Sequence, residues 1–215
     1  MSKQRITALG LALGFTLSSA FAAPGKAPTN PATDNEAHIE QAMHNPKARA
    51  AGKRAAFLCV YCHGEDGSSV QENIPNLAGQ NPVYLLTQIQ KFGDGRRNDE
   101  FMSGLIKALK EEDRVNMAVY YSTMQPKTPA SSDAALVEKG RKRYLATCIG
   151  CHGPKAIGSH STARLAGQRV SYITEALANY RSSKSPRTDP VMTTVARNLA
   201  PDDIPAVAAF LSTLK

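Results

Sequence analysis

The chain has 215 residues, of which 42% are hydrophobic and none is tryptophan, and its formal net charge is +8. This length suits one large domain or two small ones. Two domains of fewer than about 100 residues would be marginal on apolar burial alone, so a bound apolar group would complete their cores. After the first segment no stretch reaches the roughly 20 apolar residues that a membrane-spanning helix needs.

The first 22 residues have the pattern of a signal peptide. Lys3 and Arg5 give a basic start, residues 6–17 are mostly apolar, and Ala20-Phe21-Ala22 is a typical cleavage signal. We therefore expect the mature protein to begin near Ala23 and to be exported to a bacterial periplasm. An uncleaved start that anchors the chain in a membrane is the alternative.

One five-residue pattern occurs twice and accounts for all four cysteines. It reads Cys59-Val60-Tyr61-Cys62-His63 and, later, Cys148-Ile149-Gly150-Cys151-His152. Cys-x-x-Cys-His is the attachment signature of c-type haem. The two thiols would form thioethers with the haem vinyl groups, and the histidine that follows would bind the iron. The sequence thus predicts two covalently bound haem c groups, with His63 and His152 as iron ligands.

Two other chemistries use paired cysteines. A redox dithiol needs neither the histidine nor a second copy. A zinc ribbon places its two cysteine pairs about 15–20 residues apart, whereas Cys62 and Cys148 are 86 residues apart. Haem attachment explains the whole pattern better than either alternative.

The whole unit is repeated. Leu77-Ala78-Gly79-Gln80 returns as Leu165-Ala166-Gly167-Gln168, and further landmarks recur in the same order at offsets of 88 to 90 residues, including Tyr84 with Tyr172, Met102 with Met192 and Asp113 with Asp203. Such a repeat indicates two homologous units. The predicted fold is all-α, with two tandem cytochrome c-like domains that each wrap around one haem.

The predicted boundaries follow the turn and proline signals. Residues 23–45 are predicted to be a flexible N-terminal segment, 46–124 the first domain, 125–132 a linker rich in proline and serine, and 133–215 the second domain. Helices are expected from Pro46 into the first motif, from Pro82 to Lys91, from Glu111 to Met124, and after a cap at Asp133.

The sixth iron ligand is predicted from the repeat. Met192 is the only methionine of the second domain and matches Met102 in the first, each in a loop after a basic stretch. A thioether is a soft ligand that raises the haem potential. Met117 and Met124 lie on the last helix of their domain and are interpreted as core residues. His160 has no counterpart in the first domain and is interpreted as a surface residue.

These marks together resemble the dihaem cytochrome c4 family over nearly the whole mature chain. The resemblance implies an electron carrier, often membrane-associated, with two His/Met haems in domains packed face to face. It also implies that a glycine of each first helix packs on an aromatic residue of the last helix. Gly52 would pack on Tyr120 or Tyr121, and Gly140 on Phe210.

A difference between the domains lies beside the ligating histidines. Pro75 can offer its carbonyl to the second ring nitrogen of His63, and Ala163 holds the matching position for His152. We expect the two haems to differ in potential, partly for this reason.

Positive charge is concentrated in the second half. Residues 23–128 are neutral overall, whereas residues 129–215 carry a net charge of +6, most densely in residues 139–143 and 181–187. A solvated basic face is the simpler interpretation. The functional one is a docking surface for an acidic membrane complex or anionic lipid. No nucleic-acid-binding module is recognised, and nucleic acid is not expected as a partner.

The predicted function is a periplasmic electron carrier, not an enzyme, that passes electrons between redox proteins such as a quinol-oxidising complex and a membrane-bound terminal oxidase. Peripheral association with the membrane would fit that role. One alternative is a dihaem electron-transfer subunit of a larger oxidoreductase, of the flavocytochrome sulfide dehydrogenase type. A haem peroxidase would need an open iron site, which the matched methionines argue against.

Overall fold

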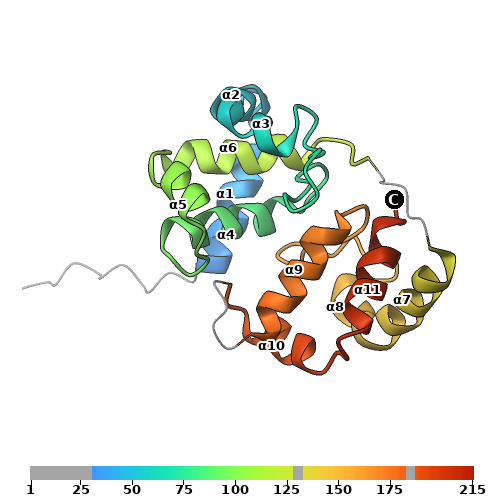
Figure 1. Cartoon of the computed structure of the whole chain (residues 1–215). Coiled ribbons are helices and arrows are strands. Elements are labelled where there is room, and N and C mark those ends of the chain that lie inside the picture. Colours follow the sequence, from blue (N-terminus) through green and yellow to red (C-terminus); the bar gives the residue numbers. More distant parts are fainter. Residues whose placement is uncertain (1–30, 128–132, 183–186) are drawn as a thin grey trace, which may run out of the picture.

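The helices of the computed structural model fall into two groups that meet along one boundary (Figure 1). The structure describes residues 31–127, 133–182 and 187–215. Residues 1–30, including the predicted signal peptide 1–22, and residues 128–132 of the predicted linker lie outside that part. Within the described residues there are helices, loops and two isolated β-bridges but no strand, which confirms the all-α prediction. None of the described helices is long and apolar enough to cross a membrane.

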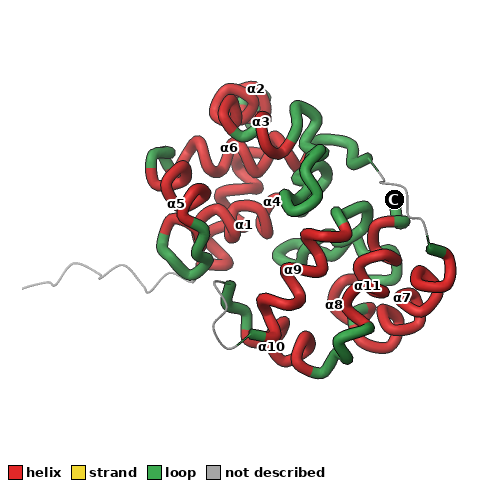
Figure 2. The backbone as a smooth tube through the Cα atoms, viewed as in Figure 1, coloured by secondary structure: helices red, strands yellow, loops and turns green. Residues whose placement is uncertain are grey.

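Figure 2 shows how short most of these helices are. The first group comprises α1 (Pro31–Met43), α2 (Ala48–Ala55), the 3₁₀ turn η1 (Ala56–Leu58), α3 (Val60–His63), α4 (Pro82–Gly93), α5 (Glu100–Lys107) and α6 (Glu111–Ser122). The second group comprises α7 (Ala134–Thr147), α8 (Ile149–His152), α9 (Val170–Arg181), α10 (Pro190–Arg197) and α11 (Asp203–Ser212).

Each group is held together by its first and last repeated helices, which cross at a glycine. A Cβ added to Gly52 of α2 would lie 2.1 Å from the Asn116 carbonyl oxygen and 2.7 Å from the Cβ of Tyr120 on α6. A Cβ on Gly140 of α7 would lie 1.9 Å from the Ala206 carbonyl oxygen, with the Phe210 Cβ also within 3 Å. Only glycine allows this approach. The expected glycine–aromatic contacts are therefore confirmed, with Tyr120 as the first partner.

Several predicted helix ends are also confirmed. Pro82 is the first residue of α4, and the Asp133 carboxylate accepts hydrogen bonds from the backbone N–H groups of Ala135 and Leu136 at the start of α7. The prediction missed α5 and α10, and it placed their methionines in loops. Both helices have only eight residues, which is too short for a clear periodic pattern.

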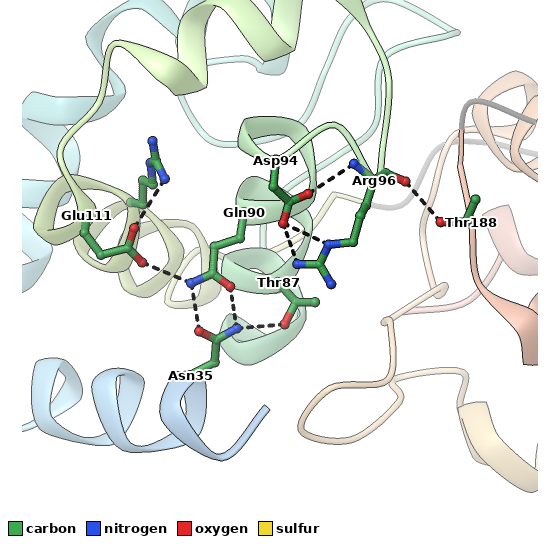
Figure 3. Close-up of polar contacts among 8 residues, drawn as sticks. Asn35, Thr87, Gln90, Asp94, Arg96, Glu111 and Thr188 are labelled. Carbon is green, nitrogen blue, oxygen red and sulfur yellow. Dashed lines mark hydrogen bonds and ion pairs between the residues drawn. The ribbon is translucent and has the colours of Figure 1, made fainter. Parts of the chain in front are cut away.

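The prediction of a flexible segment over residues 23–45 is wrong for its second part. Residues 31–43 form α1, which packs on α4 and α6. Ile39 is 3% exposed and lies in the core of the first group. The Asn35 side chain donates to the Thr87 hydroxyl at 3.1 Å and exchanges two hydrogen bonds with the Gln90 amide (Figure 3). Because Pro31 occupies the first helical position, where its missing N–H costs nothing, it begins the helix rather than interrupting it.

Candidate haem sites and the boundary between them

Both Cys-x-x-Cys-His motifs form a single helical turn. In the first motif the His63 N–H donates to the Cys59 carbonyl at 2.9 Å, and Gly64 ends the turn with a φ of +82°. In the second motif the His152 N–H donates to the Cys148 carbonyl at 3.0 Å, and Gly153 has a φ of +76°. The left-handed glycine turns the chain away directly after each histidine.

The two histidine rings are buried and held in the same way. His63 Nδ1 lies 2.9 Å from the Pro75 carbonyl oxygen, and His152 Nδ1 lies 2.9 Å from the Ala163 carbonyl oxygen. Burial lowers the pKa of both imidazoles, which favours the neutral form. A carbonyl on Nδ1 fixes the tautomer whose Nε2 is free to bind a metal. The expected outer hydrogen bonds are confirmed, and they have the same length in both halves.

The four cysteines make no disulfide. Burial raises the pKa of the Cys59 thiol, and it raises that of Cys148 to about 11. Redox dithiols depend on a lowered thiol pKa, so these values argue against the dithiol alternative. The described residues also contain no group of three or more His, Cys, Asp or Glu side chains that could hold a metal ion. Each motif therefore offers two thiols and one histidine whose Nδ1 is hydrogen-bonded and whose Nε2 is free. This is the set of groups that covalent haem attachment uses.

The two predicted methionine ligands occupy the same helical position. Met102 is the third residue of α5, and its backbone N–H donates to the Asp99 carboxylate at 2.9 Å. Met192 is the third residue of α10, and its N–H donates to Asp189 at 3.0 Å. Both side chains are half-buried. The aspartate caps, which the sequence analysis did not recognise, fix each methionine in the first turn of its helix.

The repeated Leu-Ala-Gly-Gln segments join the two groups of helices. The Gln80 amide donates to the Arg164 carbonyl at 2.8 Å and accepts from the Arg164 N–H. The Gln168 amide makes the same pair of bonds with the backbone of Asn76, at 3.0 and 2.8 Å. Asn76 and Arg164 are themselves repeat equivalents, so each glutamine binds the other half at a matching position. The boundary therefore has approximate two-fold symmetry.

Two arginines meet at the same boundary. The backbones of Arg97 and Arg187 form an isolated antiparallel bridge, and both guanidinium groups donate to the Tyr172 hydroxyl, at 3.2 and 3.0 Å. Arg187 is 8% exposed and also donates to the Tyr84 hydroxyl. Burial opposes ionisation of Tyr172, but the two positive charges outweigh it and lower its pKa. Burial dominates at Tyr84 and raises its pKa. The sequence marked both tyrosines as repeats without showing what they contact.

Several basic residues of the second half have internal partners. Arg141 Nε lies 2.8 Å from the Glu138 carboxylate, and Lys142 lies 3.9 Å from it. Arg143 donates to Asp203 at 2.7 Å. Arg187 belongs to the boundary just described. These contacts weaken the prediction of a basic docking surface at residues 139–143, where three of the four basic side chains are paired. Residues 183–186 of the second predicted stretch lie outside the described part of the chain.

The fold and the two motifs define a c-type cytochrome with two tandem domains. The cytochrome c family model matches residues 137–215. Cytochrome c4 of Azotobacter vinelandii is 33% identical over 189 residues, covering 77% of this chain and 88% of the relative. The thiosulfate dehydrogenase electron acceptor of Thiomonas intermedia is 33% identical over 181 residues, covering 78% and 83%. The crystal structure of reduced cytochrome c4 from Pseudomonas stutzeri superposes with a TM-score of 0.72 at 31% identity, covering 77% and 98%.

The chain belongs to the cytochrome c4 family. Its cofactor is covalently bound haem c, with two haems per chain, and it is an electron-transfer protein rather than an enzyme. The family assignment confirms the predicted resemblance and the predicted pair of cytochrome c-like domains.

Proposed function

We propose that the protein is a periplasmic carrier that moves electrons between redox proteins through two six-coordinate haems. Cys59 and Cys62 would attach the first haem, with His63 and Met102 as iron ligands. The second haem would use the corresponding residues, which are Cys148, Cys151, His152 and Met192. The observation that carries this assignment is the shared geometry of the two halves, in which motif turn, histidine carbonyl and capped methionine all recur.

The donor set fits haem c. Each histidine keeps Nε2 available because a carbonyl occupies Nδ1. Bound haem would supply the ferric/ferrous couple. Each methionine is a soft thioether ligand, which favours the ferrous form of that couple. The guanidinium groups of Arg97 and Arg187 concentrate positive charge at the boundary, which the propionate carboxylates of haem would complement. A rigid arrangement of these residues would hold both oxidation states with little rearrangement.

For partners, we propose a quinol-oxidising complex as electron donor and a membrane-bound terminal oxidase as acceptor, with peripheral association at the membrane. A second role has specific support from the relatives, because one of them is named as the electron acceptor of thiosulfate dehydrogenase. The chain would then serve an oxidoreductase directly, as a dihaem subunit or acceptor. Co-purification with a dehydrogenase in stoichiometric amount would favour that role over a free carrier.

The ligand assignment is tested by replacing each methionine separately. Met102→Ala and Met192→Ala should each remove half of the weak iron–methionine absorption band of the oxidised protein and lower the potential of one haem. Met117→Ala is the control, because Met117 is 3% exposed in the first core; it should cost stability without changing the band. If either ligand variant kept the full band, its methionine would not be a ligand.

A peroxidase would behave differently. With both irons six-coordinate, the reduced unmodified protein should not bind carbon monoxide readily. Each methionine variant should bind it at one haem only.

A further inference from the structure

An exposed apolar cluster lies beside the first haem motif. Phe57, Leu58 and Tyr61 are 64%, 56% and 70% exposed. The rings of Phe57 and Tyr61 meet edge to face with centroids 6.1 Å apart. These residues belong to η1 and α3, which lie near α2 at the end of the first group that faces away from the second group (Figure 1). Single exposed apolar side chains are ordinary, but a cluster of this kind marks an interaction site.

The second half shows that this cluster is not needed to hold haem. Counted from the first cysteine of each motif, Phe57 corresponds to Ala146, Leu58 to Thr147, and Tyr61 to Gly150. Because both halves hold the same group, contacts that haem requires should occur in both. The residues before the methionines satisfy that condition, since Phe101 and Val191 are both apolar and exposed. The Phe57–Leu58–Tyr61 cluster does not.

Basic residues without internal partners lie next to the cluster. Lys53 and Arg54 on α2 are exposed, and neither forms an ion pair within the described part of the chain. When the repeats are aligned on Gly52 and Gly140, these two residues correspond to Arg141 and Lys142.

The two halves differ in the acid that would pair with these cations. Arg141 and Lys142 both contact Glu138 one turn earlier on α7. The position that corresponds to Glu138 in the first half is Ala50. The charges of Lys53 and Arg54 therefore remain available to a partner.

We propose that Lys53, Arg54, Phe57, Leu58 and Tyr61, together called the outer patch, dock an electron-transfer protein whose contact surface is apolar at its centre and acidic at its rim. This inference rests on the proposed function. The apolar centre would exclude water from the contact, and the two cations would steer the encounter. Since Leu58 directly precedes Cys59 and Tyr61 directly precedes Cys62, a docked partner would lie close to the cysteines that attach the first haem. Electrons would be exchanged with this partner through the first half.

The test uses the haem-loaded protein and a surface of known chemistry. Gold coated with a mixed monolayer of carboxylate- and methyl-terminated thiols represents the acidic, apolar contact surface. Adsorbed mass is measured by quartz crystal microbalance, and the electron-exchange rate is measured by voltammetry. Two outer-patch double variants are compared. The charge variant combines Lys53→Gln and Arg54→Gln, and the apolar variant combines Phe57→Ser and Tyr61→Ser. The matched control is Arg141→Gln with Lys142→Gln in the second half.

Each outer-patch variant should bind less and exchange electrons about tenfold more slowly at low ionic strength. For the charge variant the difference should shrink near physiological salt, where screening shortens the range of the field to about 8 Å. The control should stay within about twofold of the unmodified protein. Equal losses in the control, or no loss in the outer-patch variants, would overturn the proposal.

Two further measurements distinguish failure of the docking proposal from failure of the carrier function, and a protein partner from a membrane. Spectra with haem counted per chain are recorded for every variant. If these show two His/Met haems while the rates are unchanged, the docking proposal fails and the carrier function stands. Binding is also measured to vesicles of phosphatidylcholine with one quarter phosphatidylglycerol. If the outer-patch variants lose vesicle binding but keep the electrode rate, the surface binds membrane and the proposed protein partner is wrong.

Discussion

The first and second halves of the molecule use the same internal contacts but present different outer surfaces. In each half the first and last helices cross at a glycine, a carbonyl holds the histidine, and an aspartate caps the turn that carries the methionine. On the outside, α7 pairs its own charges, whereas α2 leaves them exposed beside aromatic residues. The common interior serves the haem, and the differences indicate which half meets other proteins.

The largest effect is expected at the helix crossings. Gly140→Val and Gly52→Val would each push side-chain atoms into a backbone carbonyl about 2 Å away. Each should lower the free energy of unfolding by about 3 kcal/mol, with loss of one haem per chain. Unfolding in urea and a haem count measure both effects.

Gly104 on α5 offers a control for these variants. A Cβ at that position meets nothing within 4 Å, and its repeat equivalent is Thr194. Gly104→Ala should be neutral or stabilise the helix by up to about 1 kcal/mol. If Gly140→Val were as mild as Gly104→Ala, the crossing would not have the closeness described.

The symmetry of the boundary can be tested through its two glutamines. Gln168→Ala would leave the buried N–H and carbonyl of Asn76 without partners, and should cost about 2 kcal/mol. Gln80→Ala acts on the less buried backbone of Arg164 and should cost about 1 kcal/mol. Denaturant unfolding measures both, with exposed Gln125→Ala as control. Similar losses for Gln125→Ala would mean that these bonds contribute little.

An ion pair joins Arg143 to Asp203 in the second half, and the described residues of the first half contain no equivalent pair. The hydrogen bond from Arg143 lowers the pKa of Asp203 below its usual 3.8, so the stabilisation is present above that pH. It is lost as the pH falls through the lowered pKa. Asp203→Asn should therefore cost about 1 kcal/mol at pH 7, because the pair is only partly buried, and little at pH 2. Urea titrations at both pH values measure this.

Asp113, the repeat equivalent of Asp203, makes none of the ion pairs found among the described residues. Asp113→Asn should show no comparable pH dependence. An equal dependence in both variants would contradict the assignment to the Arg143 pair.

The smallest effect is expected at a strained turn. Ala156 has a φ of +54°, where the first half has Gly67 with a φ of +73°, and both carbonyls accept the same pair of backbone hydrogen bonds. Ala156→Gly relieves strain of about 1 kcal/mol but removes a fully buried methyl group of similar value. The free energy of unfolding should change by less than about 0.5 kcal/mol. Gly67→Ala should be clearly destabilising, because its Cβ would meet Met124 and Ala78 at 2.9 Å. If Ala156→Gly and Gly67→Ala changed the free energy of unfolding equally, the two turns would not be equivalent.

The sequence predicted best those features that depend on neighbouring residues. The motifs, the α4 start at Pro82 and the Asp133 cap all follow from local chemistry. The repeat extended this to the fold, because matching residues imply matching units. The assignment of Met102 and Met192 as ligands stays a prediction, as do the remaining domain boundaries and the difference in haem potential.

Features that depend on distant residues were not visible in the sequence. Asn35 fixes α1 through Thr87 and Gln90, which are more than 50 residues away, and no local pattern in residues 23–45 indicates these contacts. The repeated glutamines bind partners in the other half. Net charge pointed to the second half for docking because a count of charges does not show which of them are in contact, as Arg141 is with Glu138 and Arg143 with Asp203.

The most direct test of the account is the absorption spectrum of the purified, unmodified protein, oxidised and reduced, with haem counted per chain. The account predicts two c-type haems, both low-spin, with the iron–methionine band in the oxidised state and no shift when carbon monoxide is added to the reduced protein. A single haem per chain, or a high-spin spectrum that carbon monoxide changes, would contradict it and point to an open iron.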